Sequence, residues 1–224
     1  MVNWDRKYLD AGAGKLFGDR VCPYVRFVLQ TYCGGAKSAL CLADGDGRNG
    51  RWLAGQGLSV TGIDLSDVAT GYAAQGDAAA GVDVERICGD LASWDFPHNR
   101  TWDAVFMMYL QCEADVRMRA LQVGWSALGP GGVLAIEGFA QPSGPQYLGG
   151  GIGQPSDQAQ LQASTSPGRT LGPGDHDLLY RADVLGSALD GAEILELLNG
   201  RVRLDDGLKH QGSGHIIRFC ARKP

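Results

Sequence analysis

The sequence lacks the features that mark membrane, secreted and metal-binding proteins. Its six cysteines form no C-x-x-C pair and no Cys/His spacing typical of a metal site, so we predict no bound metal. There is no signal-peptide pattern and no apolar run long enough to cross a bilayer. We therefore expect a protein with no membrane partner, whose cysteines stay reduced as they do in the cytoplasm.

Positive charge is also scarce. The chain has 20 Lys and Arg against 25 Asp and Glu, a net charge of −5, and no dense basic cluster. The closing Arg218, Arg222 and Lys223 are interpreted as a solvated tail. This composition argues against a nucleic-acid-binding surface and leaves a small molecule as the expected partner.

The stretch 38–66 carries the most informative pattern. An apolar run over 39–43 predicts a buried parallel strand, and a glycine-rich turn and a short helix over 49–56 follow it. A second apolar run, 58–63, stops at Asp64. This order of strand, glycine turn, helix, strand and terminal acid is typical of the first half of a nucleotide-binding α/β sheet.

Two cofactors use this layout. Gly45, Gly47 and Gly50 spell G-x-G-x-x-G, the fingerprint of a dinucleotide site, and Asp64 lies where an acid would accept hydrogen bonds from a ribose. Proteins that bind S-adenosylmethionine (SAM) have the same order of elements. In both cases glycine lets the backbone approach the ligand because it has no Cβ. The motif alone therefore leaves a nicotinamide-dependent oxidoreductase and a SAM-dependent protein open.

Further helices and strands alternate along the chain. Helices are predicted at 21–33, 66–80, 115–128 and 181–189, and strands at 82–88, 102–108, 133–136, 193–204 and 215–221. The turn Asp205-Asp206-Gly207 predicts that the last two strands form an antiparallel hairpin. We expect a Rossmann-like, three-layer α/β sandwich with a mostly parallel seven-stranded sheet. A chain of 224 residues leaves no room for the second half and substrate domain of a typical dehydrogenase.

One domain is expected over residues 1–224, with two special segments. Residues 1–33 form an N-terminal cap, in which Trp4, Tyr8 and Phe17 either cover an edge of the core or shield a cofactor from water. Residues 141–175 are rich in Gly, Pro, Ser and Gln, and loops of this length inside a domain are often functional. We predict that this loop is a lid over the substrate site.

Taken in order, these segments resemble the class I SAM-dependent methyltransferases. ADGDGRNG resembles their glycine loop, TGIDLS the segment with the ribose acid, CGDLASWDF the segment beside adenine, and TWDAVFMMYLQ the fourth strand. Within that superfamily the likeness is closest to small bacterial tellurite-resistance and thiopurine-methyltransferase-like proteins, through Asn3-Trp4-Asp5 with Tyr8, and Gly47-Arg48-Asn49.

The resemblance implies SAM as the cofactor and a set of binding residues. These are Asp44, Gly45, Gly47, Arg48, Asp64, Leu65, Asp90, Leu91, Met108 and Tyr109. Asp64 would hold the ribose, Asp90 the adenine amine, and Met108 and Tyr109 would lie near the sulfonium. Structural alternatives stay open: Asp90 as a helix N-cap, Arg48 as a cap of the loop, and Met108 as plain core.

The resemblance also implies methyl transfer to a small acceptor, such as a thiol or a chalcogen oxyanion, by in-line displacement. The candidate bases or substrate contacts are His210, Glu137 and Glu113, and the alternative for His210 is a surface histidine. Many members carry an acid where this chain has Cys41 and a glycine where it has Ala43. Asp44 or Asp46 would supply the lost carboxylate, and a SAM-binding regulatory protein without turnover is the alternative function.

Overall fold

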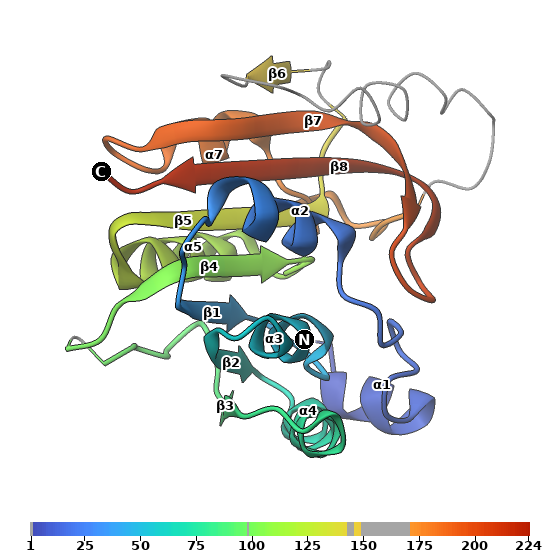
Figure 1. Cartoon of the computed structure of the whole chain (residues 1–224). Coiled ribbons are helices and arrows are strands. Elements are labelled where there is room, and N and C mark those ends of the chain that lie inside the picture. The colour runs from blue at the N-terminus through green and yellow to red at the C-terminus, as the bar shows by residue number, and fades with distance from the viewer. Residues whose placement is uncertain (1, 98, 143–145, 149–170) are drawn as a thin grey trace.

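A computed structural model describes residues 2–97, 99–142, 146–148 and 171–224. One sheet runs through it in the strand order β3-β2-β1-β4-β5-β8-β7-β6 (Figure 1). The strands are β1 (Ser38–Leu42), β2 (Ser59–Asp64), β3 (Val84–Cys88), β4 (Trp102–Met108), β5 (Leu128–Phe139), β6 (Gln146–Leu148), β7 (Glu193–Asp205) and β8 (Gln211–Arg222). The first five pair in parallel, and β8, β7 and β6 add antiparallel. The predicted seven strands and closing hairpin are confirmed, and β6 is an additional short edge strand.

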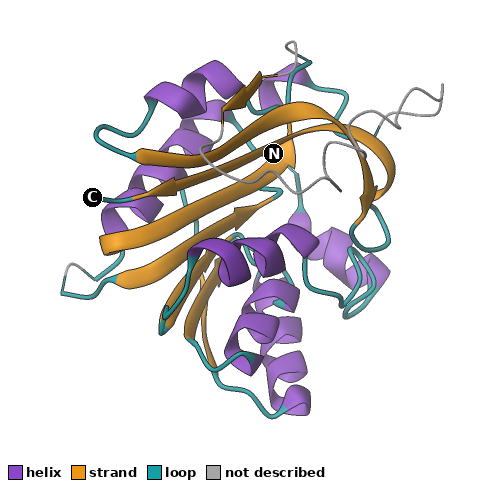
Figure 2. Ribbon diagram, turned by 45° about the horizontal axis from the view of Figure 1, so that its top comes forward, coloured by secondary structure: helices purple, strands orange, loops and turns teal. Residues whose placement is uncertain are grey.

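Helices cover both faces of the sheet (Figure 2). The helices are α1 (Trp4–Ala11), α2 (Pro23–Tyr32), α3 (Arg48–Gly55), α4 (Asp67–Ala80), α5 (Ala114–Ala127) and α7 (Ala182–Ser187), with a 3-10 turn at His176–Leu178. On one face α2 and α3 pack through Val28 and Leu53, and on the other α5 and α7 pack through Leu121 and Leu185. The N-terminal α1 lies against α4. These are the layers of the predicted sandwich.

Local sequence signals set the ends of these helices. Pro23 is the first residue of α2, where its missing N–H costs nothing. The side chain of Ser66 accepts a hydrogen bond from the Ala69 N–H and caps α4. Gly57, with φ of +90°, follows the end of α3, where a left-handed residue closes the helix.

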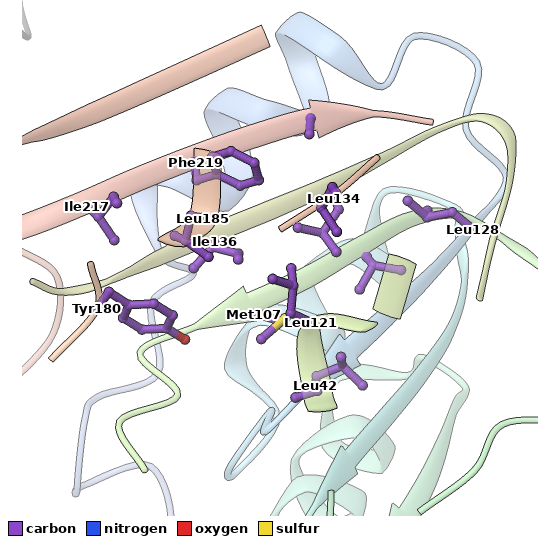
Figure 3. Close-up of a cluster of buried hydrophobic side chains, with 14 of the residues drawn as sticks. Leu42, Met107, Leu121, Leu128, Leu134, Ile136, Tyr180, Leu185, Ile217 and Phe219 are labelled. Carbon is purple, nitrogen blue, oxygen red and sulfur yellow. The ribbon is translucent and has the colours of Figure 1, made fainter. Parts of the chain in front are cut away.

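The central strands are buried on both faces, which explains their continuous apolar runs. Figure 3 shows one side of this core, where Leu42 of β1, Met107 of β4 and Ile136 of β5 gather near Leu121 and Leu185. Each such side chain contributes roughly 1.5–3 kcal/mol through burial. The core therefore fixes the positions at which the parallel strands end.

One segment differs from its sequence-based prediction, and a second lies largely outside the residues that the structure describes. The sequence predicts a helix up to residue 128 and a strand from residue 133, but β5 already begins at Leu128, which pairs with Trp102. Both of these side chains are buried, and this packing holds the segment in the sheet.

The predicted lid, 141–175, lies largely outside the described residues. The extent of the domain, 1–224, stays a prediction, as does the cytoplasmic location; among the described helices none is long and apolar enough to cross a membrane.

Candidate functional site

A pocket opens at the carboxyl ends of the parallel strands, where β1 and β4 lie side by side and their connections run in opposite directions. Open α/β sheets bind their ligands at this switch point. The glycine loop after β1 and the ends of β2, β3 and β4 supply most of the wall. The N-terminal segment, the turn between β7 and β8, Val116 of α5 and Leu178 of the 3-10 turn supply the rest.

Most of the residues predicted from the sequence meet in this pocket. Those that line it are Asp44, Gly45, Arg48, Asp64, Leu65, Asp90, Leu91, Met108, Tyr109 and His210. Two others, Gly47 and Glu137, do not line it. The order of elements in the sequence thus leads to the right strand ends, but not to every side chain that faces the ligand space.

Asp64, the last residue of β2, is held by two backbone groups. The Gly45 N–H donates to Oδ2 at 2.8 Å and the Ser66 N–H donates to Oδ1 at 2.9 Å. Burial raises the pKa of this carboxyl to about 6, against the lowering effect of these two hydrogen bonds. Each carboxylate oxygen can accept two hydrogen bonds, so each still has room for one ribose hydroxyl.

At Gly45 and Gly47 of the glycine loop, a side chain would overlap different neighbours. A Cβ on Gly45 would overlap the Tyr8 hydroxyl, inside the pocket. A Cβ on Gly47 would overlap the Arg86 guanidinium and lie 2.8 Å from the Ala73 Cβ. Gly47 is therefore required by packing between the loop and α4, and a contact of Gly47 with a cofactor has no support from this geometry.

Asp44 lines the pocket, but its carboxylate is already occupied. Arg86 of β3 donates from Nη1 to Asp44 Oδ2 at 2.5 Å, and the Gly50 N–H donates to both oxygens at 3.2 Å. Arg86 also binds Asp77 of α4. This buried network ties the glycine loop to β3 and α4. Two acids, Asp44 and Asp46, were expected to replace the one missing at Cys41. Within the described part of the chain the Asp46 carboxylate accepts a single hydrogen bond, from the Gly14 N–H at 3.2 Å, so it has more acceptor sites left than Asp44.

Arg48 is likewise engaged by a distant carboxylate. Its Nη1 and Nη2 donate to Asp206 Oδ1 and Oδ2 at 2.7 and 3.2 Å, and both side chains are less than a tenth exposed. Because Asp206 lies in the turn between β7 and β8, this pair joins the C-terminal hairpin to the N-terminus of α3. Of the two sequence-based alternatives, this contact favours the structural one.

Two pocket residues that are not glycine have a left-handed backbone. Ala43, directly after β1, and Tyr109, directly after β4, both have φ of +56°. Such a conformation costs on the order of 1–3 kcal/mol for a residue with a Cβ, and it concentrates at functional sites. The two neighbouring strands therefore turn sharply as they reach the pocket.

Aromatic side chains form the wall of the pocket that the N-terminal segment and His210 supply. Trp4, Tyr8 and Phe17 of the N-terminal segment line the pocket and belong to the hydrophobic cluster that includes Ala69 of α4. The predicted packing role is confirmed, and shielding of a cofactor stays a prediction. The His210 ring lies 3.9 Å from the Tyr109 ring and 5.5 Å from the Phe17 ring, centroid to centroid. His210 is only 5% exposed, which contradicts the alternative of a surface histidine.

Glu137 lies in a buried cluster outside the pocket. It accepts hydrogen bonds from Arg218 Nε at 2.6 Å and from Cys22 Sγ at 3.3 Å. Ligand atoms of Cys22, Glu137 and Asp206 lie within 4.8 Å of one another, a spacing that a metal ion could use. However, each carboxylate is paired with an arginine, and burial raises the pKa of the Cys22 thiol. We therefore assign this cluster to the packing of the fold.

Other pocket residues were missed by the sequence analysis. Gln111 and Cys112 follow β4 and line the pocket. The Gln111 amide accepts from the Phe139 N–H at 2.9 Å and donates to the Leu178 carbonyl at 2.5 Å, which joins β5 to the 3-10 turn. Met108 and Tyr109 were selected because they lie near the end of a strand. The same criterion would have found Gln111 and Cys112.

The charge of the pocket favours a cation. Its acids are Asp44, Asp46, Asp64, Asp90 and Glu113, and its one arginine among the described residues, Arg48, is paired with Asp206. A dinucleotide would bring a doubly charged pyrophosphate next to Asp44 and Asp46. SAM would bring a sulfonium, an ammonium group and one carboxylate, and its net positive charge suits these acidic side chains.

Comparison with known proteins agrees with this geometry. Residues 39–132 match the family described as methyltransferase domain, whereas no curated protein matches the chain. Among solved structures, TehB from Haemophilus influenzae has a TM-score of 0.67 at 13% identity, over 91% of this chain and 63% of that one.

Two further structures share the fold. One, described under the conversion of a disulfide bond into a thioacetal group in echinomycin biosynthesis, has a TM-score of 0.65 at 19% identity and covers 98% of this chain and 90% of that one. The magnesium protoporphyrin IX methyltransferase ChlM from Synechocystis PCC 6803, with bound S-adenosylhomocysteine, has a TM-score of 0.55 at 16% identity over 90% and 80%. At these identities the structures establish the fold, and the matched segment, 39–132, is similar to the methyltransferase domain.

Proposed function

We propose that this chain transfers the methyl group of SAM to a small-molecule acceptor. One observation carries the proposal: the glycine loop, Asp64, Asp90 and the end of β4 line a single pocket whose charge suits a cationic ligand. The nicotinamide-dependent alternative would need a pocket that tolerates a pyrophosphate.

The residues that would hold SAM follow from their places in the wall. The free acceptor sites of Asp64 would take the two ribose hydroxyls, beside the exposed face of Leu65. Asp90 and Leu91 would flank the adenine, although Asp90 Oδ1 also accepts the Ala92 N–H at 2.9 Å and so stabilises its own turn. Asp46, rather than Asp44, would face the ammonium group.

The sulfonium would lie near Met108 and Tyr109, at the end of β4. When bound, SAM supplies a methyl carbon that is already activated, because the C–S bond breaks towards a neutral thioether. The chain then has to align the acceptor with that carbon and exclude water. Such alignment can contribute roughly 7–11 kcal/mol to lowering the barrier. The aromatic wall from Trp4 to Phe17 would exclude the water.

The acceptor would enter on the side of His210, Gln111 and Cys112. His210 is the candidate base on this wall, whereas Glu137 lies outside it and is neutralised by Arg218. A thiol, a chalcogen oxyanion and a small phenol are the acceptor classes to compare, since only some of them carry a proton that must be removed. A cytoplasmic enzyme with one domain and no nucleic-acid partner is part of this proposal.

Two experiments test it. In calorimetric titrations we expect S-adenosylhomocysteine to bind and NAD(H) not to bind, and binding of the dinucleotide alone would overturn the proposal. Transfer of an isotopically labelled methyl group is then measured with thiols, selenite, tellurite and small phenols. Cofactor binding without transfer to any acceptor would favour the alternative, a SAM-binding regulatory protein.

A further inference from the structure

The turn between β7 and β8 places a buried imidazole on the acceptor side of the pocket. His210 lines the pocket, yet its Nδ1 is fully buried and has no hydrogen-bond partner in the described part of the chain. Asp206 Oδ2 lies 3.7 Å from this nitrogen, too far for a hydrogen bond. Buried polar atoms without a partner are rare, and catalytic hydrogen bonds are often long before the ligand binds.

The Asp206 carboxylate is charged and fixed in position, so it can accept a hydrogen bond from His210 Nδ1. Burial works against its charge, but the nearby His210 and Arg48 together lower the pKa of this carboxyl below its usual value. Its backbone N–H donates to the His210 carbonyl at 3.0 Å, which fixes the spacing of the turn. Gly207 inside the turn has φ of +77°, and a Cβ there would overlap the Phe17 carbonyl.

Three rings restrict the plane of the imidazole. Tyr109 lies 3.9 Å from it, centroid to centroid, and Phe17 and Phe139 each lie 5.5 Å from it. Because Nδ1 of His210 is buried on the side of Asp206, Nε2 is the ring nitrogen that can contact a ligand in the pocket. The ionisable groups around the ring are Asp206 of its own turn, Arg48 of α3 and Tyr109 after β4.

We propose that Asp206 is a positioning residue that keeps the proton of His210 on Nδ1, so that Nε2 acts as the base towards the acceptor. This rests on the proposed function and narrows its substrate class to acceptors whose nucleophilic atom carries a proton, such as a phenol, an alcohol or an amine. Nε2 takes that proton as the acceptor lone pair forms the bond to the methyl carbon. The electrons of the broken C–S bond remain on sulfur, and the imidazolium formed is stabilised by the Asp206 carboxylate.

The first test needs no turnover, so it is independent of the proposed function. Side-chain ¹⁵N NMR of the whole protein reads the tautomer of His210, and the variant H210Q assigns its signals among the four histidines. We expect the Nδ1–H tautomer in the wild type and a shift towards Nε2–H in D206N. A wild-type ring in the Nε2–H form would overturn the proposal even if D206N does not fold.

The second test uses activity with a phenol, an amine and tellurite. D206N is expected to lower kcat for the proton-bearing acceptors by about tenfold or more and to move the acid limb of the kcat profile to lower pH, with little change in the KM for SAM. The matched control is D205N, because the neighbouring Asp205 is exposed and forms a surface ion pair with Arg20. If D206N changes KM alone, or if tellurite is the sole acceptor and is methylated equally by D206N, the proposal is wrong.

Discussion

The hydroxyl group of Tyr8 lies over Gly45, so close that a Cβ on this glycine would overlap the phenolic oxygen. Gly45 also has φ of +58° and donates its N–H to Asp64. One residue of the glycine loop thus contacts both the N-terminal cap and the acid at the end of β2. A change at Gly45 should therefore disturb both sides of the cofactor site at once.

The variant Gly45→Ala is expected to weaken S-adenosylhomocysteine binding by tenfold or more, which corresponds to about 1.4 kcal/mol. The added methyl group displaces Tyr8 and strains a left-handed backbone. Calorimetry measures the change. Gly55→Ala is the control, because a Cβ at this helical position meets no atom within 4 Å and should leave binding unchanged. Equal dissociation constants for wild type and Gly45→Ala would contradict the expectation.

Binding should depend on pH through Asp64. Its pKa of about 6, raised by burial, means that the carboxyl becomes protonated between pH 7 and pH 5. Ribose hydroxyls donate to the ionised form, so the bound state favours a lower pKa. The affinity for S-adenosylhomocysteine is therefore expected to fall as the pH drops below about 6.

Calorimetric titrations from pH 8 to pH 5 measure this dependence. Asp64→Asn should bind more weakly at pH 7 and show a flatter profile over the same window, since it has no proton to gain. An affinity of the wild type that stays constant down to pH 5 would show that Asp64 does not touch the ribose.

The ion pair between Arg86 and Asp44 should matter for folding. Both side chains are less than a tenth exposed, and Arg86 also binds Asp77. Arg86→Met leaves the buried Asp44 carboxylate without its cation, whereas Asp77 still pairs with Arg51 at 3.2 Å. We expect this change to lower the free energy of unfolding by about 3–5 kcal/mol. Arg6→Gln breaks the exposed Arg6–Asp10 pair and should cost less than about 1 kcal/mol. Urea denaturation compares the two, and a similar loss in both would refute the structural role of Arg86.

Ala43 should tolerate glycine better than an ordinary strand residue does. Its φ of +56° strains a residue with a Cβ, and glycine removes that strain while adding chain entropy to the unfolded state. We expect Ala43→Gly to leave the free energy of unfolding unchanged or to raise it by up to about 1 kcal/mol. Ala39→Gly, at a buried position within β1, should lower the free energy of unfolding by about 1 kcal/mol. Equal losses in both variants would contradict the role of strain.

Much of the fold could be predicted from local patterns. The apolar runs that became β1, β2 and β4, the cap at Ser66 and the glycine after α3 depend on residues a few positions apart. Because parallel strands end at one edge of their sheet, the same patterns led to Asp64, whereas Asp90 and Met108 were implied by the resemblance to class I methyltransferases. The start of β5 at Leu128 was missed, since its pairing with Trp102 outweighs the local turn signal of the glycines around Pro130.

The sequence by itself determined the order of strands and helices, the glycine loop and the acid after β2, because each depends on neighbours along the chain. Only the tertiary structure decided which charged groups remain available to a ligand. Arg86 lies 42 residues from Asp44, Asp206 lies 158 from Arg48, and Arg218 lies 81 from Glu137. Such pairs form through strand register and hairpin packing, which no local periodicity encodes, and they leave Asp64, Asp46 and His210 to face the pocket.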